Sequence, residues 1–276
     1  MYHGEHTPSP LRSCLIEGCL ETGVDYKNGG PLYGDAQFLS FGMPETADSL
    51  AAIKKFIFEE KRYTMAQLVD ALKKNFEGYD EMRAVLTSGP KFGNDNPYVD
   101  SIMTDITDHW FARLKMSRTF RRGRNAGGCS TFVNSPGVGK KCGTLPCGHL
   151  AGDPNFSDSI NAVPGLDRNG PTAAVKSALA YDQTEVTSGF VFHLRFEKKV
   201  FATEKGMDSF LQLAKVYFAN GGQQMSINVL SPEDLLEAQK HPEKYGDLIV
   251  RVGGYSDYFI RISKDLQDNV IARTSH

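Results

Sequence analysis

One stretch near the end of the chain decides the fold: Asp247-Leu248-Ile249-Val250-Arg251-Val252-Gly253-Gly254-Tyr255-Ser256-Asp257-Tyr258-Phe259. Leu248 to Val252 is one β-branched run, Tyr258 to Ile262 is a second, and a Gly-Gly pair lies between them. Two such runs separated by glycines are typical of a β-hairpin. The residues alone therefore predict a hairpin here.

The composition limits what the rest of the chain can be. Its 276 residues suffice for one large domain or two small ones. With 31 basic and 33 acidic residues the net charge is −2, and no basic-aromatic patch indicates nucleic acid. No apolar run is long enough to span a membrane, and the polar start with its two prolines does not resemble a secretory signal. Five cysteines without framework spacing favour the reducing cytoplasm.

The first half of the chain predicts loops followed by helices. Residues 1–45 are turn-rich, with a short helix expected over Cys14 to Glu21. Residues 46–118 show apolar positions at helical spacing and read as a helical run. Thr46 is the expected cap of its first helix, Thr64 and Gln67 form a capping-box pattern, and Pro97 suits the first turn of its last helix.

Residues 119–170 lose this periodicity and are rich in Gly, Pro, Asn and Ser. A loop of this length is usually functional or marks a boundary. It contains a basic patch, and Cys142 and Cys147 lie close to His149. A metal site would need more ligands at better spacing, so we expect loop cysteines and no metal. The patch consists of Arg121, Arg122 and Arg124.

Regular structure returns after Asp167 and alternates between helix and strand. The pattern predicts strands over Ser188 to Phe196 and Gln224 to Leu230. A helix from Asp208 to Ala219 separates them, and a second, capped by Ser231 with Pro232 in its first turn, follows them. Strand, helix, strand, helix, strand is α/β organisation.

The hairpin also resembles the C-terminal signature of the glycyl radical enzymes, the pyruvate formate-lyase-like family. The matching residues are Arg251-Val252-x-Gly254-Tyr255-Ser256-x-x-Phe259. The resemblance implies that Gly254 carries a stable backbone radical. Glycine suits this role because a Cβ would be pushed against the planar radical, and because glycine reaches backbone conformations closed to other residues.

Further blocks resemble the same family, in the family's order, and extend the likeness from about Leu11 to His276. They are Ala47 to Lys55, Asn75 to Tyr79, Pro90 to Asp95, Asp167 to Ala173, and Asn220-Gly221-Gly222 with Ile227 to Val229 and Ala238 to Glu243.

The resemblance implies the C-terminal part of a ten-stranded α/β barrel, with the helical run at 46–118. We assign residues 1–150 to the barrel domain and residues 151–276 to the glycine radical domain. The implied chemistry needs no bound cofactor. An activating enzyme that uses S-adenosylmethionine and an iron–sulfur cluster takes a hydrogen atom from Gly254, whose radical generates a thiyl radical on a cysteine. The implied full enzyme is a homodimer that acts on a small molecule.

The catalytic cysteine of the family lies further before the glycine than this chain is long, so we expect it to be absent. Gly18-Cys19-Leu20-Glu21 resembles the family's loop, with Cys19 as thiyl site and Glu21 as base. Its position argues against that role, because Cys19 comes only 28 residues before the helix that begins at Ala47. We expect Cys19 to be a packed cysteine.

The sequence thus predicts the C-terminal segment or subunit of a glycyl radical enzyme, inactive without the missing N-terminal half-barrel. Its reaction stays open among acyl transfer with formate, dehydration, C–N or C–S cleavage, and decarboxylation. The alternative is a stand-alone spare radical domain or a truncated protein without catalysis of its own. We further expect Gly254 near the tip of a buried loop, and an unusually large apolar surface on the isolated chain.

Overall fold

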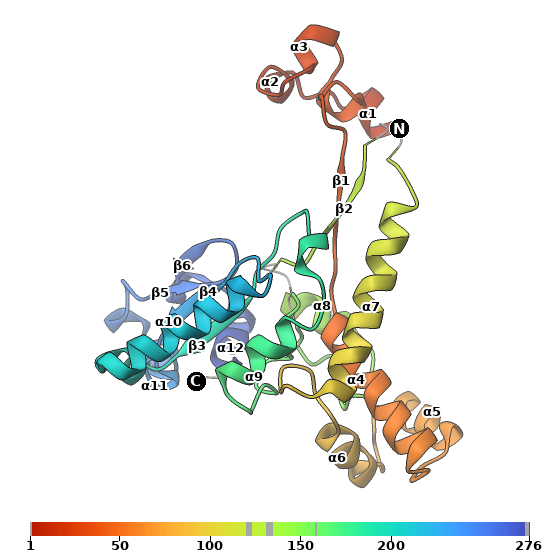
Figure 1. Ribbon diagram of the computed structural model, residues 1–276, viewed down its shortest axis with the longest axis vertical. Helices are drawn as coiled ribbons and strands as arrows, with labels where there is room; N and C mark the ends of the chain where they lie inside the picture. The colour runs from red at the N-terminus through yellow and green to blue at the C-terminus, as the bar shows by residue number, and fades with distance from the viewer. Residues whose placement is uncertain (1, 120–122, 131–134, 158, 274–275) are drawn as a thin grey trace.

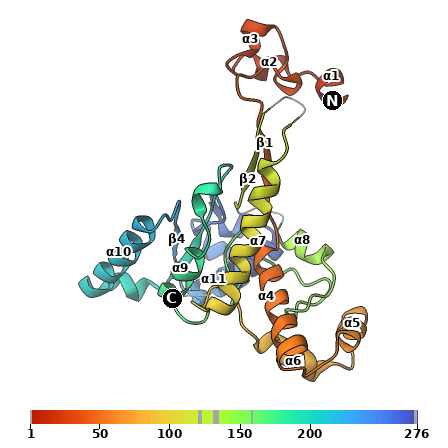
Figure 2. The same ribbon diagram turned by 45° about the vertical axis from the view of Figure 1, so that its right-hand side comes forward.

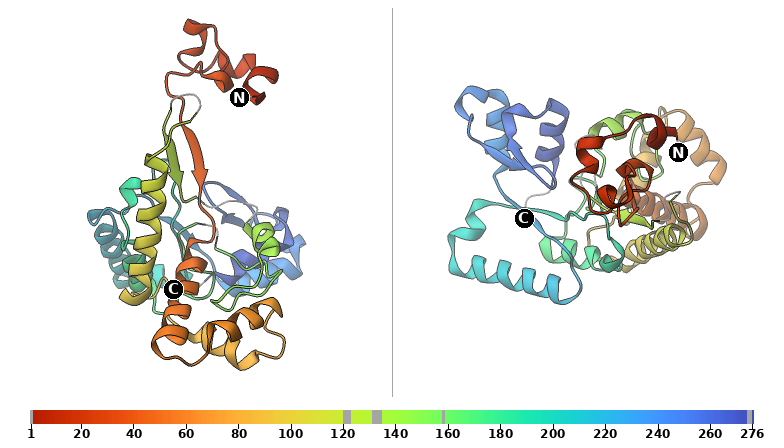
Figure 3. Two further views of the ribbon diagram at one scale, coloured as in Figure 1. Left: turned by 90° about the vertical axis from the view of Figure 1, so that its right-hand side faces the viewer. Right: turned by 90° about the horizontal axis from the view of Figure 1, so that it is seen from above.

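The computed structural model describes residues 2–119, 123–130, 135–157, 159–273 and 276. Three short helices form an N-terminal unit that stands apart from the body of the molecule, joined to it by the strands β1 and β2 (Figures 1 and 3). The single helix predicted over Cys14 to Glu21 is wrong, because Gly18 adopts a left-handed φ of 94° and interrupts it. The helices are α1 (Tyr2–His6), α2 (Pro10–Ser13) and α3 (Cys19–Thr22), followed by a 3-10 turn at Tyr26–Asn28.

The predicted helical run is confirmed, with one correction at its start. The first helix is capped by Gly42, and Thr46 lies inside it with its hydroxyl donating to the Gly42 carbonyl at 2.8 Å. Thr64 and Gln67 do form a capping box, and Pro97 does open the longest helix. That helix, α7, packs along α4 (Figures 1 and 2). The elements are α4 (Met43–Ile53) with a π-helical extension over Lys54–Glu59, α5 (Met65–Lys73), α6 (Asp80–Ser88) and α7 (Pro97–Lys115).

The segment predicted to be irregular contains a strand and a helix. β2 (Asn125–Gly128) runs parallel to β1 (Ala36–Leu39), with Ala36 opposite Asn125. α8 (Ser135–Lys141) follows. Of the predicted basic patch, Arg121 and Arg122 lie outside the described residues, and the Arg124 guanidinium lies 3.3 Å from the Asp35 carboxylate.

The C-terminal half follows the predicted alternation, with strands shorter than the apolar runs that predicted them. β3 and β4 pair in parallel, with His193 opposite Ser226, and β5 and β6 pair antiparallel, with Ile249 opposite Tyr258. The elements are α9 (Pro171–Ala178), β3 (His193–Phe196), α10 (Glu204–Ala219), β4 (Ser226–Val229), α11 (Pro232–Lys240), β5 (Ile249–Arg251), β6 (Ser256–Tyr258) and α12 (Lys264–Ala272), with 3-10 turns at Gln183–Glu185, Lys198–Ala202, Pro242–Lys244 and Phe259–Arg261.

The hairpin has an apolar core of its own, which we call the hairpin core. It is separate from the main core, in which α4, α7, α9 and β3 bury their apolar side chains. The hairpin core consists of Leu230, Leu235, Ala238, Val250, Val252, Phe259, Ile262, Leu266 and Val270. A third cluster lies between the end of α4 and the pair α5–α6. β4 uses both of its faces, because Ile227 packs against the main core while Ser226 and Asn228 are buried on the other side.

Apolar side chains are exposed along α10, as expected for a chain with an uncovered face. Met207, Leu211 and Phe218 lie on one side of this helix, and Phe218 is 51% exposed. An apolar hollow of about 800 Å³ lies between α4 and α7, and Leu50 and Trp110 are among the residues that line it.

We predict that these surfaces make the isolated chain self-associate. Sedimentation should show species heavier than the 30.5 kDa monomer, and Leu211→Gln with Phe218→Gln should shift them toward the monomer. A monodisperse wild-type monomer at tens of micromolar would argue for an independently soluble domain.

A buried carboxyl in α4 predicts a pH-dependent stability. Burial raises the pKa of Asp48 from 3.8 to about 7, although Lys91 and the Phe92 N–H, which donates at 2.8 Å, both lower it. Because the folded chain holds this proton more tightly, the contribution favours folding at low pH and is lost as the pH rises through about 7. Asp48→Asn should reduce the loss of unfolding free energy between pH 5 and pH 8 by roughly 2–4 kcal/mol in urea titrations. An unchanged pH slope would contradict this.

Candidate functional site

The glycine pair forms the turn of the β5–β6 hairpin. The N–H groups of Val252 and Gly253 both point to the Tyr255 carbonyl, at 3.1 and 3.4 Å. Gly253 is buried, but Gly254 is exposed, and apart from its chain neighbours no described atom lies within 4 Å of the place where a Cβ would stand on it. The expectation of a buried Gly254 is therefore wrong for this chain. The hairpin core covers the strands below the turn, whereas Gly254, Tyr255 and Ser256 are exposed in the described chain.

The other residues of the signature divide into anchors and surface residues. Val252 and Phe259 are fully buried in the hairpin core. The Arg251 guanidinium donates to the Ser256 hydroxyl across the hairpin at 3.4 Å. Tyr255, at the turn, is exposed. The signature thus combines two apolar anchors with a polar, accessible turn.

The end of β5 next to the turn is held by the side chain of Asn228 on β4. The Arg251 N–H donates to Asn228 Oδ1 at 2.8 Å, and Asn228 Nδ2 donates to the Arg251 carbonyl at 3.1 Å. One side-chain amide therefore satisfies both backbone groups of Arg251, as a neighbouring strand would. This contact attaches the hairpin to the parallel β3–β4 pair three residues before Gly254.

Two arginines tie the last helix to the same region. Arg273, just after α12, donates to the Val252 carbonyl at 3.2 Å. Arg195 on β3 is buried and donates to the carbonyls of Val270 at 2.9 Å and Ile271 at 3.2 Å, and to that of Arg273. The carbonyls at the end of α12 thus receive the donors that a helix C-terminus lacks.

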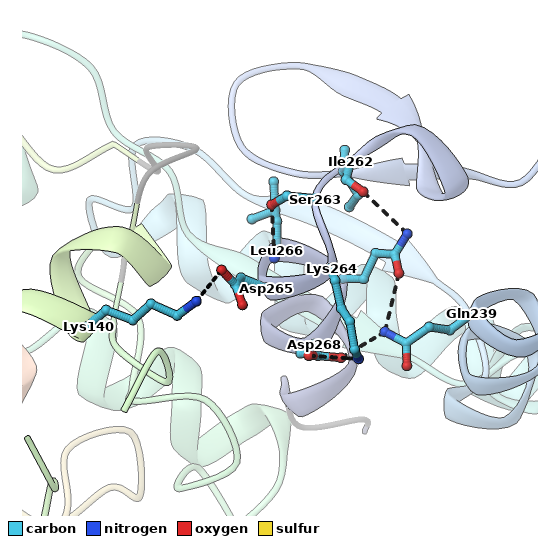
Figure 4. A network of polar contacts seen from close by, with 9 residues as sticks. Lys140, Gln239, Ile262, Ser263, Lys264, Asp265, Leu266 and Asp268 are labelled. Atoms are coloured by element: carbon cyan, nitrogen blue, oxygen red, sulfur yellow. Dashed lines mark hydrogen bonds and ion pairs between the residues drawn. The ribbon is translucent and has the colours of Figure 1, made fainter. Parts of the chain in front are cut away.

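The N-terminal part of α12 carries the polar network of Figure 4. Lys140 on α8 lies 2.5 Å from the Asp265 carboxylate, and Gln239 on α11 donates to Asp268 at 2.7 Å. The Ser263 hydroxyl accepts from the Leu266 N–H and caps the helix. α12 therefore connects the hairpin core to both α8 and α11.

The structure places Cys19 and Glu21 far from the hairpin. Cys19 is buried in α3, and burial raises the pKa of its thiol, as do Asp25 and Glu21 nearby. The Glu21 carboxylate accepts from the Gly18 N–H at 2.9 Å and so caps the helix. The N-terminal unit and the β5–β6 hairpin occupy different ends of the molecule (Figure 3). That Cys19 is not the thiyl site stays a prediction.

Of the remaining cysteines, Cys129 and Cys147 are buried, Cys142 is half-buried and Cys14 is exposed. Cys129 contacts the Ser40 hydroxyl at 3.3 Å, and the Cys147 N–H donates to the Ser49 hydroxyl at 3.3 Å. Among the described residues, no group of three or more His, Cys, Asp and Glu side chains could hold a metal ion. No described helix is long and apolar enough to cross a membrane.

Sequence reasoning missed the roles of Asn228, Arg195 and Arg273. Asn228 lies on β4 between Ile227 and Val229, where the alternating pattern places polar residues toward solvent. The structure buries it instead, against a strand more than 20 residues away in the sequence. A pattern read along one strand does not reveal such a partner.

Comparisons with known proteins decide the family. A family model described as pyruvate formate lyase-like matches residues 1–138, and one described as glycine radical matches residues 156–260. The chain belongs to the pyruvate formate lyase-like family of glycyl radical enzymes. It corresponds to a C-terminal portion of such enzymes, whose fold is a ten-stranded α/β barrel. The boundary between residues 150 and 151 falls between the two matched ranges and stays a prediction.

Relatives of known activity include several dehydratases. The chain is 38% identical to trans-4-hydroxy-L-proline dehydratase of Clostridioides difficile over 98% of its own length and 34% of that relative. It is 33% identical to (2S)-3-sulfopropanediol dehydratase of Klebsiella oxytoca, covering 99% of this chain and 34% of that one. The B12-independent glycerol dehydratase from Clostridium butyricum superposes with a TM-score of 0.93 at 33% identity, over 99% of this chain and 35% of that one. The chain thus spans about a third of the length of these relatives.

The Asn228 contact predicts which substitution loosens the hairpin. Asn228→Ala leaves the Arg251 N–H and carbonyl without their partner, which should cost about 1–3 kcal/mol of unfolding free energy and speed hydrogen exchange at Arg251. Ser226→Ala is the matched control, because this neighbour is equally buried and its hydroxyl has no hydrogen-bond partner in the described chain. Equal effects of the two substitutions would contradict the assignment.

Proposed function

We propose that this chain stores a glycyl radical on Gly254 and forms the C-terminal catalytic part of a dehydratase or lyase. One observation carries the proposal: the signature from Arg251 to Phe259 forms a hairpin with Gly254 at its turn, inside the range matched by the glycine radical model. In this proposal Arg251, Val252, Tyr255, Ser256 and Phe259 support the radical residue.

The surroundings of Gly254 suit removal of a hydrogen atom by another protein. The turn is exposed, so an activating enzyme that uses S-adenosylmethionine and an iron–sulfur cluster can reach the α-carbon. The planar radical requires that no side chain stand on that carbon, which glycine satisfies. Asn228 and Arg273 hold the strand that enters the turn, so the rest of the hairpin keeps its position. No bound cofactor enters this part of the chemistry.

The partner of the radical is a thiol, which we place outside these 276 residues. The chain spans about a third of its relatives, and Cys19 lies in the distant N-terminal unit. The thiyl cysteine then comes from the other half-barrel, either as part of a longer protein or as a partner subunit. A half-barrel supplied in this way would also cover the turn and exclude oxygen and water from the radical. We place the assembled enzyme in the cytoplasm, as a homodimer.

The reaction class follows from the relatives, whose names describe dehydratases and sulfite-lyases. We therefore favour elimination from a small polar molecule over transfer of an acyl group to or from formate. A spare radical domain without catalysis of its own is the second candidate. It would need only the hairpin half, whereas the match at residues 1–138 favours part of a barrel.

Electron paramagnetic resonance tests the radical assignment. Anaerobic treatment with a matching activating enzyme and S-adenosylmethionine should give a doublet, because one α-hydrogen remains and splits the signal. Air should then break the backbone at Gly254 and release about 22 residues. Gly254→Ala should abolish both results while folding normally, because a Cβ there meets no described atom and the backbone φ is not left-handed.

The matched control is Gly253→Ala, which should keep the doublet and the cleavage. A doublet that survives Gly254→Ala, or cleavage that maps to Gly253, would overturn the assignment. Turnover by this chain alone should be undetectable. Turnover that disappears in Cys19→Ser would identify Cys19 as the thiyl site.

A further inference from the structure

A cationic hollow lies where the segment between α6 and α7 meets the loop before α9. Its residues are distant in the sequence from the β5–β6 hairpin. Its volume is about 370 Å³, and Lys55, Lys91 and Arg168 line it. Among the described residues, no Asp or Glu lines it. Thr87 and Ser88 also belong to the lining, so hydroxyl groups accompany the three cations.

Lys91 is an unusual member of this group because the residue is only 7% exposed. Its ammonium donates to the Leu86 carbonyl at 2.9 Å, which uses one of its three donors. Burial lowers the pKa of Lys91, and the like charge of Arg168 lowers it as well. The carboxyl that opposes this effect is Asp48, whose own pKa is raised to about 7. At neutral pH the Asp48 carboxyl is therefore only partly ionised, and it offsets only part of the positive charge of Lys91.

The two loops that carry Lys91 and Arg168 are held together by Asn94. Its Nδ2 donates to the carbonyls of Lys91 at 3.1 Å and Leu166 at 2.8 Å, and its Oδ1 accepts from the Arg168 N–H at 2.7 Å. Asn94 thus fixes the backbone of the two loops, while the Lys91 ammonium and the Arg168 guanidinium themselves donate to the carbonyls of Leu86 and Gly165, at 2.9 and 3.2 Å. A site organised in this way binds a ligand without first ordering its loops.

We propose that this hollow binds a phosphate group, either as inorganic phosphate or as the phosphate of a small monoester. The Lys55 ammonium lies 3.8 Å from the Glu60 carboxylate, but no carboxylate belongs to the lining itself. The excess of cations in the lining favours a dianion over a singly charged group, because each close opposite charge adds to the attraction. The volume exceeds that of phosphate alone, so the organic part of a monoester fits beside it. The site does not involve Gly254, so a test of phosphate binding is independent of a test of the radical chemistry.

Titration calorimetry at constant ionic strength and neutral pH tests the site, with inorganic phosphate in one arm and glycerol phosphate in the other. We expect saturable binding at one site per chain in at least one arm. Tighter binding of glycerol phosphate would identify a monoester as the ligand, and equal affinities would identify the phosphate group alone. Arg168→Gln should weaken binding by roughly tenfold, as loss of one charge-assisted hydrogen bond predicts. Lys91→Met should weaken binding to a similar degree. Because Arg168 is exposed, Arg168→Gln does not disturb the folded core, so its result can be read as an effect on binding.

Lys215→Gln on α10 is the control, since it removes the same charge from an exposed site on another element. It should leave the affinity unchanged. The proposal is overturned if neither compound binds saturably, if Arg168→Gln binds as tightly as the wild type, or if Lys215→Gln weakens binding as much as Arg168→Gln does.

Discussion

The hairpin depends on one side-chain amide. Asn228 exchanges two hydrogen bonds with the backbone of Arg251, at 2.8 and 3.1 Å, and thereby replaces the strand that would otherwise continue the sheet. Both backbone groups of Arg251 would be left unsatisfied without it, and buried backbone groups rarely lack partners. The contact joins the hairpin core, which packs by itself, to the β3–β4 pair and the main core. The position of Gly254 relative to the rest of the chain follows from this junction and from Arg273.

Neighbouring residues of the hairpin differ sharply in their burial. Val252 and Phe259 are completely buried, so the strands beside the turn are fixed by packing. Gly254 itself is exposed, and apart from its chain neighbours no described atom lies within 4 Å of the place where a Cβ would stand on it. In the proposed function, this arrangement lets the Gly254 α-carbon be presented to another protein without disturbing the core beneath it. The exposed apolar residues of α10 and the hollow between α4 and α7 are likewise surfaces that a larger assembly would cover.

Local features of the fold could be predicted, because their causes are local. The capping box of Thr64 and Gln67, the first-turn Pro97, and the alternation that forms β3 and β4 all arise from residues a few positions apart. The pairing of Ala36 with Asn125 could not be predicted, since nothing in either segment identifies the other. The start of α4 was misplaced because Gly42 takes the capping position ahead of Thr46.

In the candidate site, too, the features with local causes could be predicted and those with distant partners could not. The signature around Gly254 is contiguous and could be recognised, and Val252 and Phe259 could be expected inside from their apolar character. Asn228, Arg195 and Arg273 act across separations of 21 residues or more, and each has a polar side chain whose pattern suggests solvent. The prediction of a buried Gly254 is wrong because burial at this position depends on a segment that lies over it, and in the described chain Gly254 is exposed.

The central claim is that the α-carbon of a glycine in this chain holds the unpaired electron. Protein made with glycine deuterated at the α-carbon, activated as the unlabelled chain is, tests it most directly. A deuteron couples far more weakly than a proton, so the account predicts that the doublet collapses toward a single line. A doublet that is unchanged by the label would place the radical on another residue and contradict the account.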